Sequence, residues 1–232
     1  MNYTSTQVIE KCENEILNPV TFYQSDVVNY RGKTSDTKTY YTEIVADFLI
    51  KNIELFRCGI PKITRTASYK TVSHDGVYSE LSTRIEEVTA MKMFNYSKKG
   101  NIYDFIGRII DYQTPLKSKR SDEAGKIDLL AYDGKTLRLL ELKKIDSVET
   151  MLRCVLEGYT YFKTVDAAKL LCDFGLPLST KVTACPFVFT QGVQWEEMQE
   201  NRPKLKELMA ALESKPYYIS CRESDFYIVK DE

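Results

Sequence analysis

Residues 127–142 contain the strongest local folding signal in the chain, two apolar runs separated by Asp133-Gly134. The runs cover residues 127–132 and 136–142 and are rich in leucine. Asp-Gly is favoured between paired strands, because both central residues of a type I′ turn need a positive φ. The pattern therefore predicts an antiparallel hairpin.

The turn also predicts the register of the two strands. We take Tyr132 and Lys135 as the pair that closes the turn. Asp128 then lies opposite Leu139, and Glu141 is its diagonal neighbour, about 7–8 Å away. Two carboxylates at that separation can hold one hard cation between them, because Mg²⁺–oxygen bonds are about 2.1 Å long.

Side-chain alternation places Asp128, Glu141 and Lys143 on one face of this hairpin. Apolar residues flank all three charges, so both faces of the strands are expected to be buried. A buried carboxylate must be paired or bound to a metal ion. The alternative is a partly exposed hairpin in which the acidic side chains simply pair with the lysine.

Hydrophobic periodicity predicts the other elements. Residues 77–95 are expected to form a helix that buries Leu81, Ile85, Val88 and Met91. The remaining expected elements are helices over 40–57, 146–165 and 196–212, strands over 182–190, 217–221 and 226–229, and a segment over 102–110 that suits either state.

Two of these helices carry boundary signals. Asp146, followed three residues later by Glu149, is typical of a capping box at the start of a helix. Pro203 must open or bend the helix predicted around it. The order of elements predicts an α/β domain with its core in residues 77–232. Residues 1–76 are expected to be an N-terminal helical extension packed on that core, in one compact domain overall.

Composition excludes several classes of function. The chain has 232 residues, a formal net charge of −1 and one histidine, His74. One histidine cannot build a histidine-rich zinc site, and its position before Asp75-Gly76 predicts an exposed turn. Six cysteines without a CxxC pair predict small buried thiols in a reduced compartment. The short apolar runs and the polar residues 1–17 predict a cytoplasmic protein without a membrane partner.

The charged residues of the hairpin form a recognisable motif. They are Asp128, then, after twelve intervening residues, Glu141, Leu142 and Lys143. This Asp…Glu-x-Lys spacing resembles the signature of the PD-(D/E)xK superfamily, the restriction-endonuclease-like nucleases. Ile127 stands where the family name has proline. The resemblance implies a restriction-endonuclease-like core, with a helix, an antiparallel β-meander, a second helix and a strand.

The resemblance assigns a role to each motif residue. Asp128 and Glu141 are the implied acidic metal ligands, and the backbone carbonyl of Leu142 is the third ligand. Lys143 is the implied lysine that orients or deprotonates the attacking water and stabilises charge on the phosphate. The implied cofactor is Mg²⁺, with Mn²⁺ as a substitute, which generates hydroxide near neutral pH.

Members of this family often add a glutamate from the first core helix, for which Glu80, Glu86 and Glu87 are candidates. On a helical wheel Glu87 lies nearer than Glu86 to the apolar face, so Glu87 is preferred as a catalytic residue. Alternatively, all three glutamates are solvated and Arg84 is their partner.

Two further polar groups have open roles. Arg153, Glu157 and Tyr161 recur at helical spacing, where some relatives have a polar motif facing the site, and an ordinary exposed face is the alternative. A basic loop before the hairpin either contacts phosphates or is simply solvated. Its residues are Lys117, Lys119, Arg120 and Lys126.

The resemblance implies a metal-dependent phosphodiesterase that hydrolyses DNA, and duplex-cutting relatives often act as homodimers. The alternative is a catalytically silent protein of the same fold that binds nucleic acid or protein. The low net charge favours this alternative, whereas the complete motif favours the enzyme. A role in a toxin–antitoxin, phage-defence or mobile-element system is compatible with either.

Overall fold

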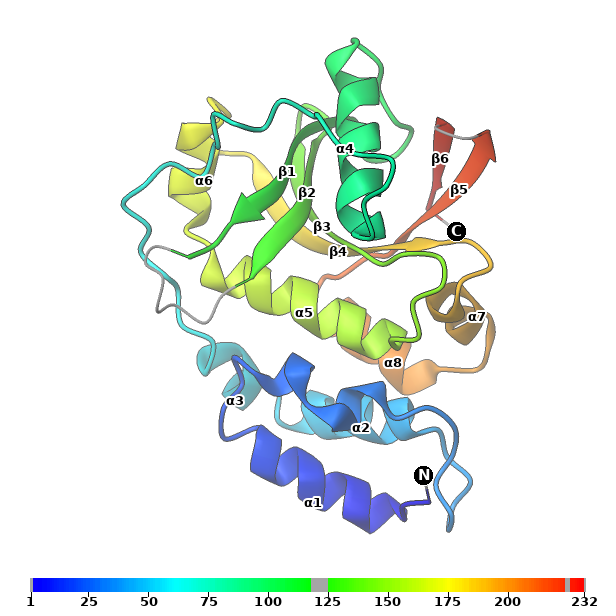
Figure 1. Ribbon diagram of the computed structural model, residues 1–232. Coiled ribbons are helices and arrows are strands. Elements are labelled where there is room, and N and C mark those ends of the chain that lie inside the picture. Colours follow the sequence, from blue (N-terminus) through cyan, green and yellow to red (C-terminus); the bar gives the residue numbers. More distant parts are fainter. Residues whose placement is uncertain (1, 118–124, 224–225, 232) are drawn as a thin grey trace.

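The computed structural model describes residues 2–117, 125–223 and 226–231, which form a mixed α/β structure (Figure 1). A six-stranded sheet has the order β1-β2-β3-β4-β5-β6. Its strands are β1 (Arg108–Pro115), β2 (Lys126–Tyr132), β3 (Thr136–Leu142), β4 (Lys181–Phe189), β5 (Tyr217–Glu223) and β6 (Phe226–Lys230). The helices are α1 (Ser5–Glu15), α2 (Tyr41–Lys51), α3 (Ile53–Cys58), α4 (Ile85–Lys98), α5 (Met151–Thr164), α6 (Ala167–Asp173), α7 (Val193–Gln199) and α8 (Pro203–Ala211), with short 3-10 turns at Phe22–Gln24 and Asp26–Asn29.

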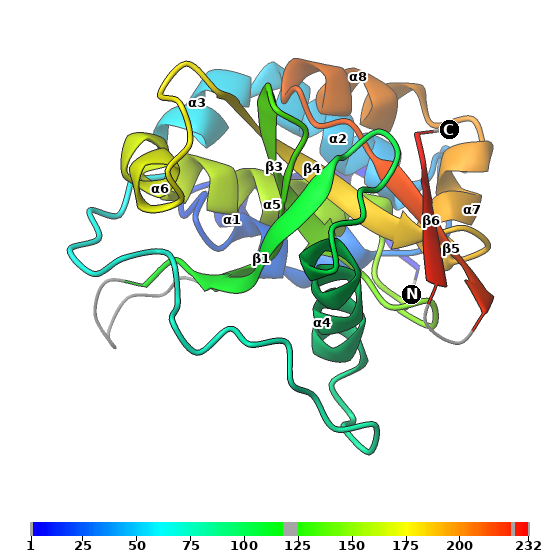
Figure 2. The ribbon, with the colours of Figure 1, turned by 90° about the horizontal axis from the view of Figure 1, so that it is seen from above.

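The sheet combines an antiparallel meander with parallel strands. β1, β2 and β3 are antiparallel, β3, β4 and β5 are parallel, and β6 returns antiparallel to β5. α4 packs on one face of the sheet and α5, the crossover from β3 to β4, packs on the other (Figure 2). Met93 and Leu140 belong to the core on the α4 side, and Leu139 and Leu152 to the core on the α5 side. The predicted α/β class is confirmed.

The hairpin forms where the sequence predicts it, but its register is wrong by two residues. Tyr132 pairs with Leu137 and not with Lys135. The Asp133 carboxylate accepts hydrogen bonds from the backbone N–H groups of Lys135 and Thr136, at 2.9 and 2.8 Å. These two bonds hold a wider turn than the two-residue turn that Asp-Gly favours.

A shift of two residues leaves every side chain on its predicted face. Continuing the observed register by one step sets Asp128 opposite Glu141, not opposite Leu139. The backbone N–H of Leu142 accordingly donates to Asp128 Oδ2 at 2.9 Å. The two acidic residues are therefore direct cross-strand neighbours instead of diagonal ones.

The helix predicted over residues 77–95 begins only at Ile85, and two of the four residues on its predicted buried face are exposed. Leu81 is 92% exposed and Ile85 is 49% exposed. The Ser79 and Ser82 hydroxyls accept backbone N–H groups two residues further on, and such local bonds compete with helix formation. The residues that α4 buries are Thr89, Ala90, Met93 and Ser97.

α5 begins later than predicted, and Asp146 does not cap it. The N-cap is Thr150, whose side-chain oxygen accepts the backbone N–H of Arg153 at 3.1 Å. Glu149, the predicted capping-box partner, instead lies 2.9 Å from Lys143 Nζ. A buried ammonium group binds a nearby carboxylate more strongly than an exposed helix end does, which explains the difference.

Two other predicted helices are each divided. The helix predicted over 196–212 is two helices, because Pro203 occupies the first turn of α8 and has no N–H to continue α7. The helix predicted over 40–57 forms, and a change of backbone conformation at Asn52 separates α2 from α3.

The segment over 102–110, which suited either state, is a turn followed by the start of β1. Gly107 has a φ of +82°, and a Cβ at this position would lie 2.3 Å from the carbonyl oxygen of Tyr132. Only glycine allows this approach, so Gly107 fixes where β1 meets β2.

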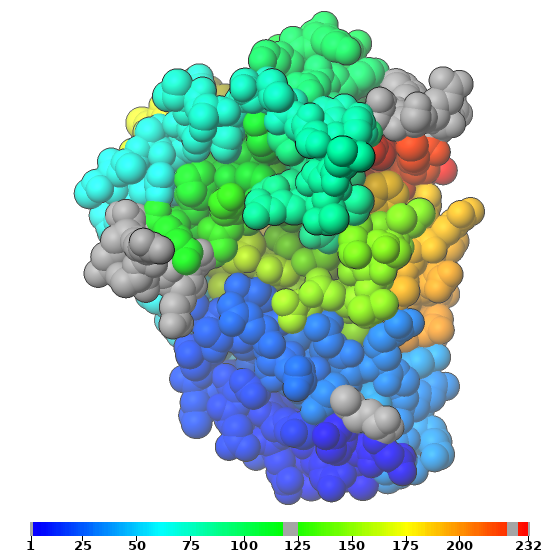
Figure 3. Space-filling view, in the orientation of Figure 1, coloured from blue at the N-terminus to red at the C-terminus, as the bar shows by residue number. Residues whose placement is uncertain are grey.

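Residues 2–60 pack beneath α5 and α8, where their space-filling surface is continuous with the rest of the molecule (Figure 3). Leu49 of this extension and Leu205 of α8 belong to one hydrophobic cluster. The Glu43 carboxylate accepts the backbone N–H groups of Lys204 and Leu205, both at 2.9 Å. An acidic side chain of the extension therefore caps a helix of the core.

Candidate functional site

Asp128 lies near the start of β2, and neighbouring strands hold its carboxylate from both sides. Oδ1 accepts a hydrogen bond from Gln113 Nε2 of β1 at 2.8 Å, and Oδ2 accepts the backbone N–H of Leu142 of β3 at 2.9 Å. Gln113 has a φ of +48°, which side-chain-bearing residues rarely adopt. Such strain often accompanies functional sites, and here it accompanies the contact with Asp128.

The surroundings of Asp128 disfavour its charged form. Burial is the main cause that raises the pKa of Asp128 to about 7. Glu86 and Glu157 add to this rise by repulsion, whereas Lys143 opposes it. A cation next to this carboxylate would favour the ionised form.

Lys143 follows β3 and lies among three carboxylates. Its Nζ is 2.8 Å from Glu157 Oε2, 2.9 Å from Glu141 Oε1 and 2.9 Å from Glu149 Oε2. The Lys143 side chain is 7% exposed. Burial by itself would lower the pKa of Lys143, but the carboxylates outweigh it and hold this pKa well above its usual value. The lysine is therefore a fixed positive charge.

The pKa values of Glu141 and Glu157 shift in opposite directions. Burial, followed by repulsion from Glu157, raises the pKa of Glu141 well above its usual value. Burial would also raise the pKa of Glu157, yet Lys143 holds it below its usual value. One lysine thus neutralises only part of the negative charge in the cluster. The remainder is suited to a proton or to an added cation.

Glu86 is the α4 glutamate whose carboxylate contacts the backbone just after β3. Its Oε1 accepts the backbone N–H of Lys144 at 3.0 Å. Glu87, which the helical wheel favours, pairs with Arg84 Nη1 at 3.2 Å. Both glutamates line the same pocket as Asp128.

The helical wheel that favours Glu87 contains a false assumption. It places Leu81 and Ile85 on a buried face, and both residues are exposed. Glu80 lies before α4 and its carboxylate is 3.4 Å from Lys92 Nζ.

The polar residues of α5 point toward the motif, so the exposed-face alternative is wrong for Glu157. The Tyr161 hydroxyl donates to Glu157 Oε1 at 3.0 Å, while the other carboxylate oxygen contacts Lys143. Arg153 pairs with Glu149 at 2.8 Å. The four-residue spacing in the sequence was the signal for this arrangement.

Asp128 opens onto a pocket of about 350 Å³ between α4 and the meander. Its lining residues are Thr83, Arg84, Ile85, Glu86, Glu87, Gln113, Asp128 and Lys144. Of the basic loop, Lys117 and Lys126 are exposed, and Lys119 and Arg120 lie outside the described residues. A phosphate contact by this loop stays a prediction.

His74 is not the exposed turn residue that the sequence predicts. Its Nδ1 lies 2.6 Å from Asp111 Oδ1, and its ring stacks on Tyr112 with centroids 4.4 Å apart. Its side chain is 16% exposed. The backbone N–H of Gly76 donates to the hydroxyl of Tyr112 of β1 at 3.1 Å, so the histidine is enclosed by a strand distant in sequence.

The six thiols are free, as predicted, but only half of them are buried. The buried ones are Cys12, Cys154 and Cys185, and the exposed ones are Cys58, Cys172 and Cys221.

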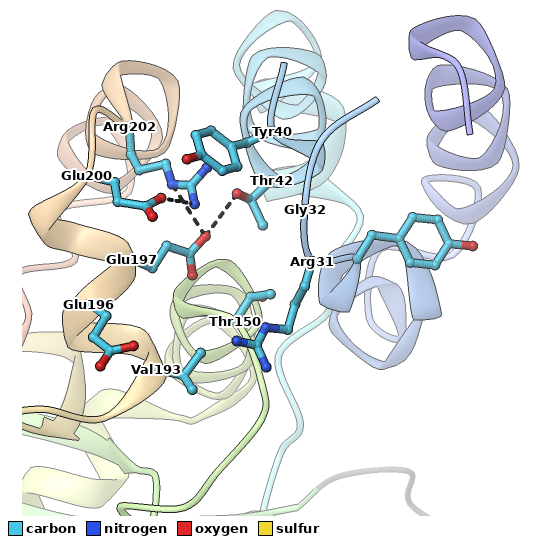
Figure 4. A pocket seen from close by; sticks show the side chains of 11 residues that line it. Arg31, Gly32, Tyr40, Thr42, Thr150, Val193, Glu196, Glu197, Glu200 and Arg202 are labelled. Carbon is cyan, nitrogen blue, oxygen red and sulfur yellow. Dashed lines mark hydrogen bonds and ion pairs between the residues drawn. The ribbon is translucent and has the colours of Figure 1, made fainter. Parts of the chain in front are cut away.

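A second cavity of about 180 Å³ lies between the extension and α7 (Figure 4). Its charged groups join separate parts of the chain. The Glu197 carboxylate accepts the Thr42 hydroxyl at 2.9 Å and the backbone N–H of Met151 at 2.8 Å. Arg202 pairs with Glu200 at 2.6 Å. These contacts account for Glu197 and Arg202 without a catalytic role.

The donors at the Asp128 pocket are of the kind that Mg²⁺ prefers. Asp128 and Glu86 line this pocket together, and repulsion from Glu86 adds to the burial that raises the pKa of Asp128. Within the described ranges, no three acidic, histidine or cysteine side chains gather closely enough to hold an ion by themselves. Two of the nearby carboxylates are instead engaged by Lys143. The donor types therefore fit the ion, and the acidic cluster is in a lysine-paired state.

Comparisons with known proteins provide no assignment. No model of a protein family matches the chain, and neither the curated proteins nor the solved structures contain a match. No helix in the described part of the chain has both the length and the hydrophobicity of a membrane span.

Proposed function

We propose that this chain is a metal-dependent phosphodiesterase that hydrolyses DNA and that its core is related to the PD-(D/E)xK nucleases. The observation that carries the proposal is the position of Lys143, buried between Glu141 and Glu157 beside an aspartate that opens onto a pocket. The succession α4, β1, β2, β3, α5 and β4 supports the same relationship.

Each residue of the site has a separate role in the proposed reaction. Asp128, Glu141 and the Leu142 carbonyl, together with Glu86 from α4, would hold Mg²⁺, which when bound supplies Lewis acidity and a hydroxide near neutral pH. Gln113 fixes the orientation of the Asp128 carboxylate. Lys143 stabilises the negative charge that develops on the phosphate. Because carboxylates hold the pKa of this lysine high, we assign it charge stabilisation and not the removal of a proton from water.

The test is cleavage of a mixed pool of plasmid, linear duplex, single-stranded and branched DNA together with RNA, in Mg²⁺ or Mn²⁺. Asp128→Asn and Glu141→Gln are assayed beside the wild type, with Asp104→Asn, in the turn before β1, as an exposed control. We expect cleavage of DNA that both site variants lose and the control keeps. Cleavage that survives in both site variants would reject the proposed site.

A catalytically silent binding protein of the same fold is the second candidate. The observation that favours it is the pairing of Lys143 with Glu141, which leaves no ready cluster of three acidic ligands among the described residues. Calorimetric titration with Mn²⁺ separates the two candidates. Binding that Asp128→Asn abolishes favours the enzyme, and DNA binding without Mn²⁺ binding favours the silent protein.

A further inference from the structure

A groove at the far end of α4 combines lysines with tyrosines. It has a volume of about 430 Å³. Its lining residues are Tyr78, Lys92, Asn95, Tyr96, Lys98 and Lys99. Glu86 of the candidate site lies in the first turn of the same helix. The groove and the Asp128 pocket are therefore held at a fixed separation by one rigid element.

Positive charge is available in this groove. Lys98 Nζ donates to the backbone carbonyl oxygen of Asp75 at 3.1 Å, which is a neutral acceptor. Lys99 is exposed. Lys92 is balanced by Glu80, 3.4 Å away. Lys98 and Lys99 thus provide the attraction for an anion, close to two tyrosine rings.

The tyrosine rings border the same space. Lys92 Nζ lies over the Tyr78 ring, 5.4 Å from its centroid, and Tyr96 packs on Tyr103 with centroids 5.0 Å apart. Both Tyr78 and Tyr96 are partly exposed. Lysines beside accessible aromatic faces are the combination by which proteins hold single-stranded nucleic acid, with phosphates on the cations and bases stacked on the rings.

We infer that the groove binds a single-stranded segment of the DNA substrate. This inference rests on the proposed nuclease function. A single strand is favoured over a duplex because the groove combines Lys98 and Lys99 with two partly exposed tyrosine rings. Non-specific duplex binding depends mainly on many phosphate contacts, and a chain with a net charge of −1 is poorly suited to supply them.

The experiment measures binding of fluorescent (dT)12 in the Asp128→Asn background, where cleavage cannot interfere. Lys98→Gln/Lys99→Gln is compared with Lys62→Gln/Lys206→Gln, a pair of exposed lysines on other elements. Losing two phosphate contacts should lower the slope of log affinity against log salt by about 1.4, since each contact contributes about 0.7 for single strands. The control pair should leave the slope unchanged. Tyr78→Ala should weaken binding without changing the slope.

The outcomes distinguish this inference from the proposed function. Equal slopes for the two lysine pairs, or tighter binding of a 12-base-pair duplex than of (dT)12, would overturn the groove as a single-strand site. Neither result would affect cleavage that depends on Asp128. Lys98 also lies at the negative end of the α4 dipole. If that were its only role, Lys98→Gln would lower the unfolding temperature and leave (dT)12 affinity unchanged, which would also overturn the inference.

Discussion

The ammonium group of Lys143 lies 2.8 Å from the carboxylate of Glu157, and this contact joins the end of β3 to α5. Glu141 approaches the same ammonium group within the strand, at 2.9 Å. Removing the lysine would therefore leave at least two carboxylates buried without their cation. The energetic cost of that state provides the first prediction.

Lys143→Gln should lower the free energy of unfolding at pH 8 by about 3–5 kcal/mol, the range for breaking a buried ion pair. The loss should be smaller at pH 5. Without the lysine, the folded-state pKa values of the carboxylates rise further, so the cost grows as pH increases above their unfolded values. Urea unfolding of the metal-free protein at pH 8 and at pH 5 measures both losses of stability. A loss no larger than that of exposed Lys206→Gln would contradict the buried pairing.

Asp128→Asn should change the pH dependence of stability in EDTA. The folded pKa of Asp128, about 7, is raised above the value of 3.8 expected for the unfolded chain. The folded protein therefore binds the extra proton between these values, and its stability falls as pH rises through them. The variant lacks this titration, so its stability relative to wild type should increase from pH 4 to pH 8. Parallel stability curves would show that Asp128 titrates normally.

Glu86→Gln and Glu87→Gln form a matched pair on α4. Glu86 accepts the backbone N–H of Lys144, just after β3, whereas Glu87 pairs with Arg84. Glu86→Gln should reduce Mg²⁺-dependent cleavage by at least about 100-fold, since even groups that only support metal ligands cost 10–100-fold. Glu87→Gln should keep most of the activity. The reverse ranking, measured as initial rates at saturating Mg²⁺, would favour Glu87 as the helix carboxylate.

Glu43→Ala should destabilise the protein without altering its chemistry. The variant removes the acceptor of the Lys204 and Leu205 N–H groups at the start of α8. The loss of a helix cap predicts about 1–2 kcal/mol. Urea unfolding gives the stability, and cleavage per folded molecule should equal that of the wild type. A large loss of activity with unchanged stability would indicate that the extension takes part in the reaction.

The features that the sequence predicted correctly depend on neighbouring residues. The hairpin, its acidic face and the strand β4 follow from a turn signal, alternation and an apolar run. The register was wrong because the Asp133 side chain bonds two backbone groups, a detail that the Asp-Gly pair does not specify. The start of α4 was wrong because serine hydroxyls before it hold local turns.

The parts of the site that were missed depend on contacts between distant segments. Gln113 reaches Asp128 only because β1 pairs with β2 and adopts a rare backbone conformation. Glu149 was assigned to a helix cap, and its ion pair with Lys143 depends on how the loop after β3 folds back. The helical-wheel preference for Glu87 over Glu86 depended on where α4 begins.

The most direct measurement is the Mg²⁺-dependent cleavage rate of the wild type and of Asp128→Asn, on the DNA substrate that the mixed pool identifies. Both proteins are first shown to be folded by their unfolding transitions at pH 8. We predict that EDTA abolishes cleavage by the wild type and that the variant cleaves at least about 100-fold more slowly, because Asp128 is the central implied metal ligand. Equal rates in the two proteins would contradict the assignment of this pocket as a nuclease site.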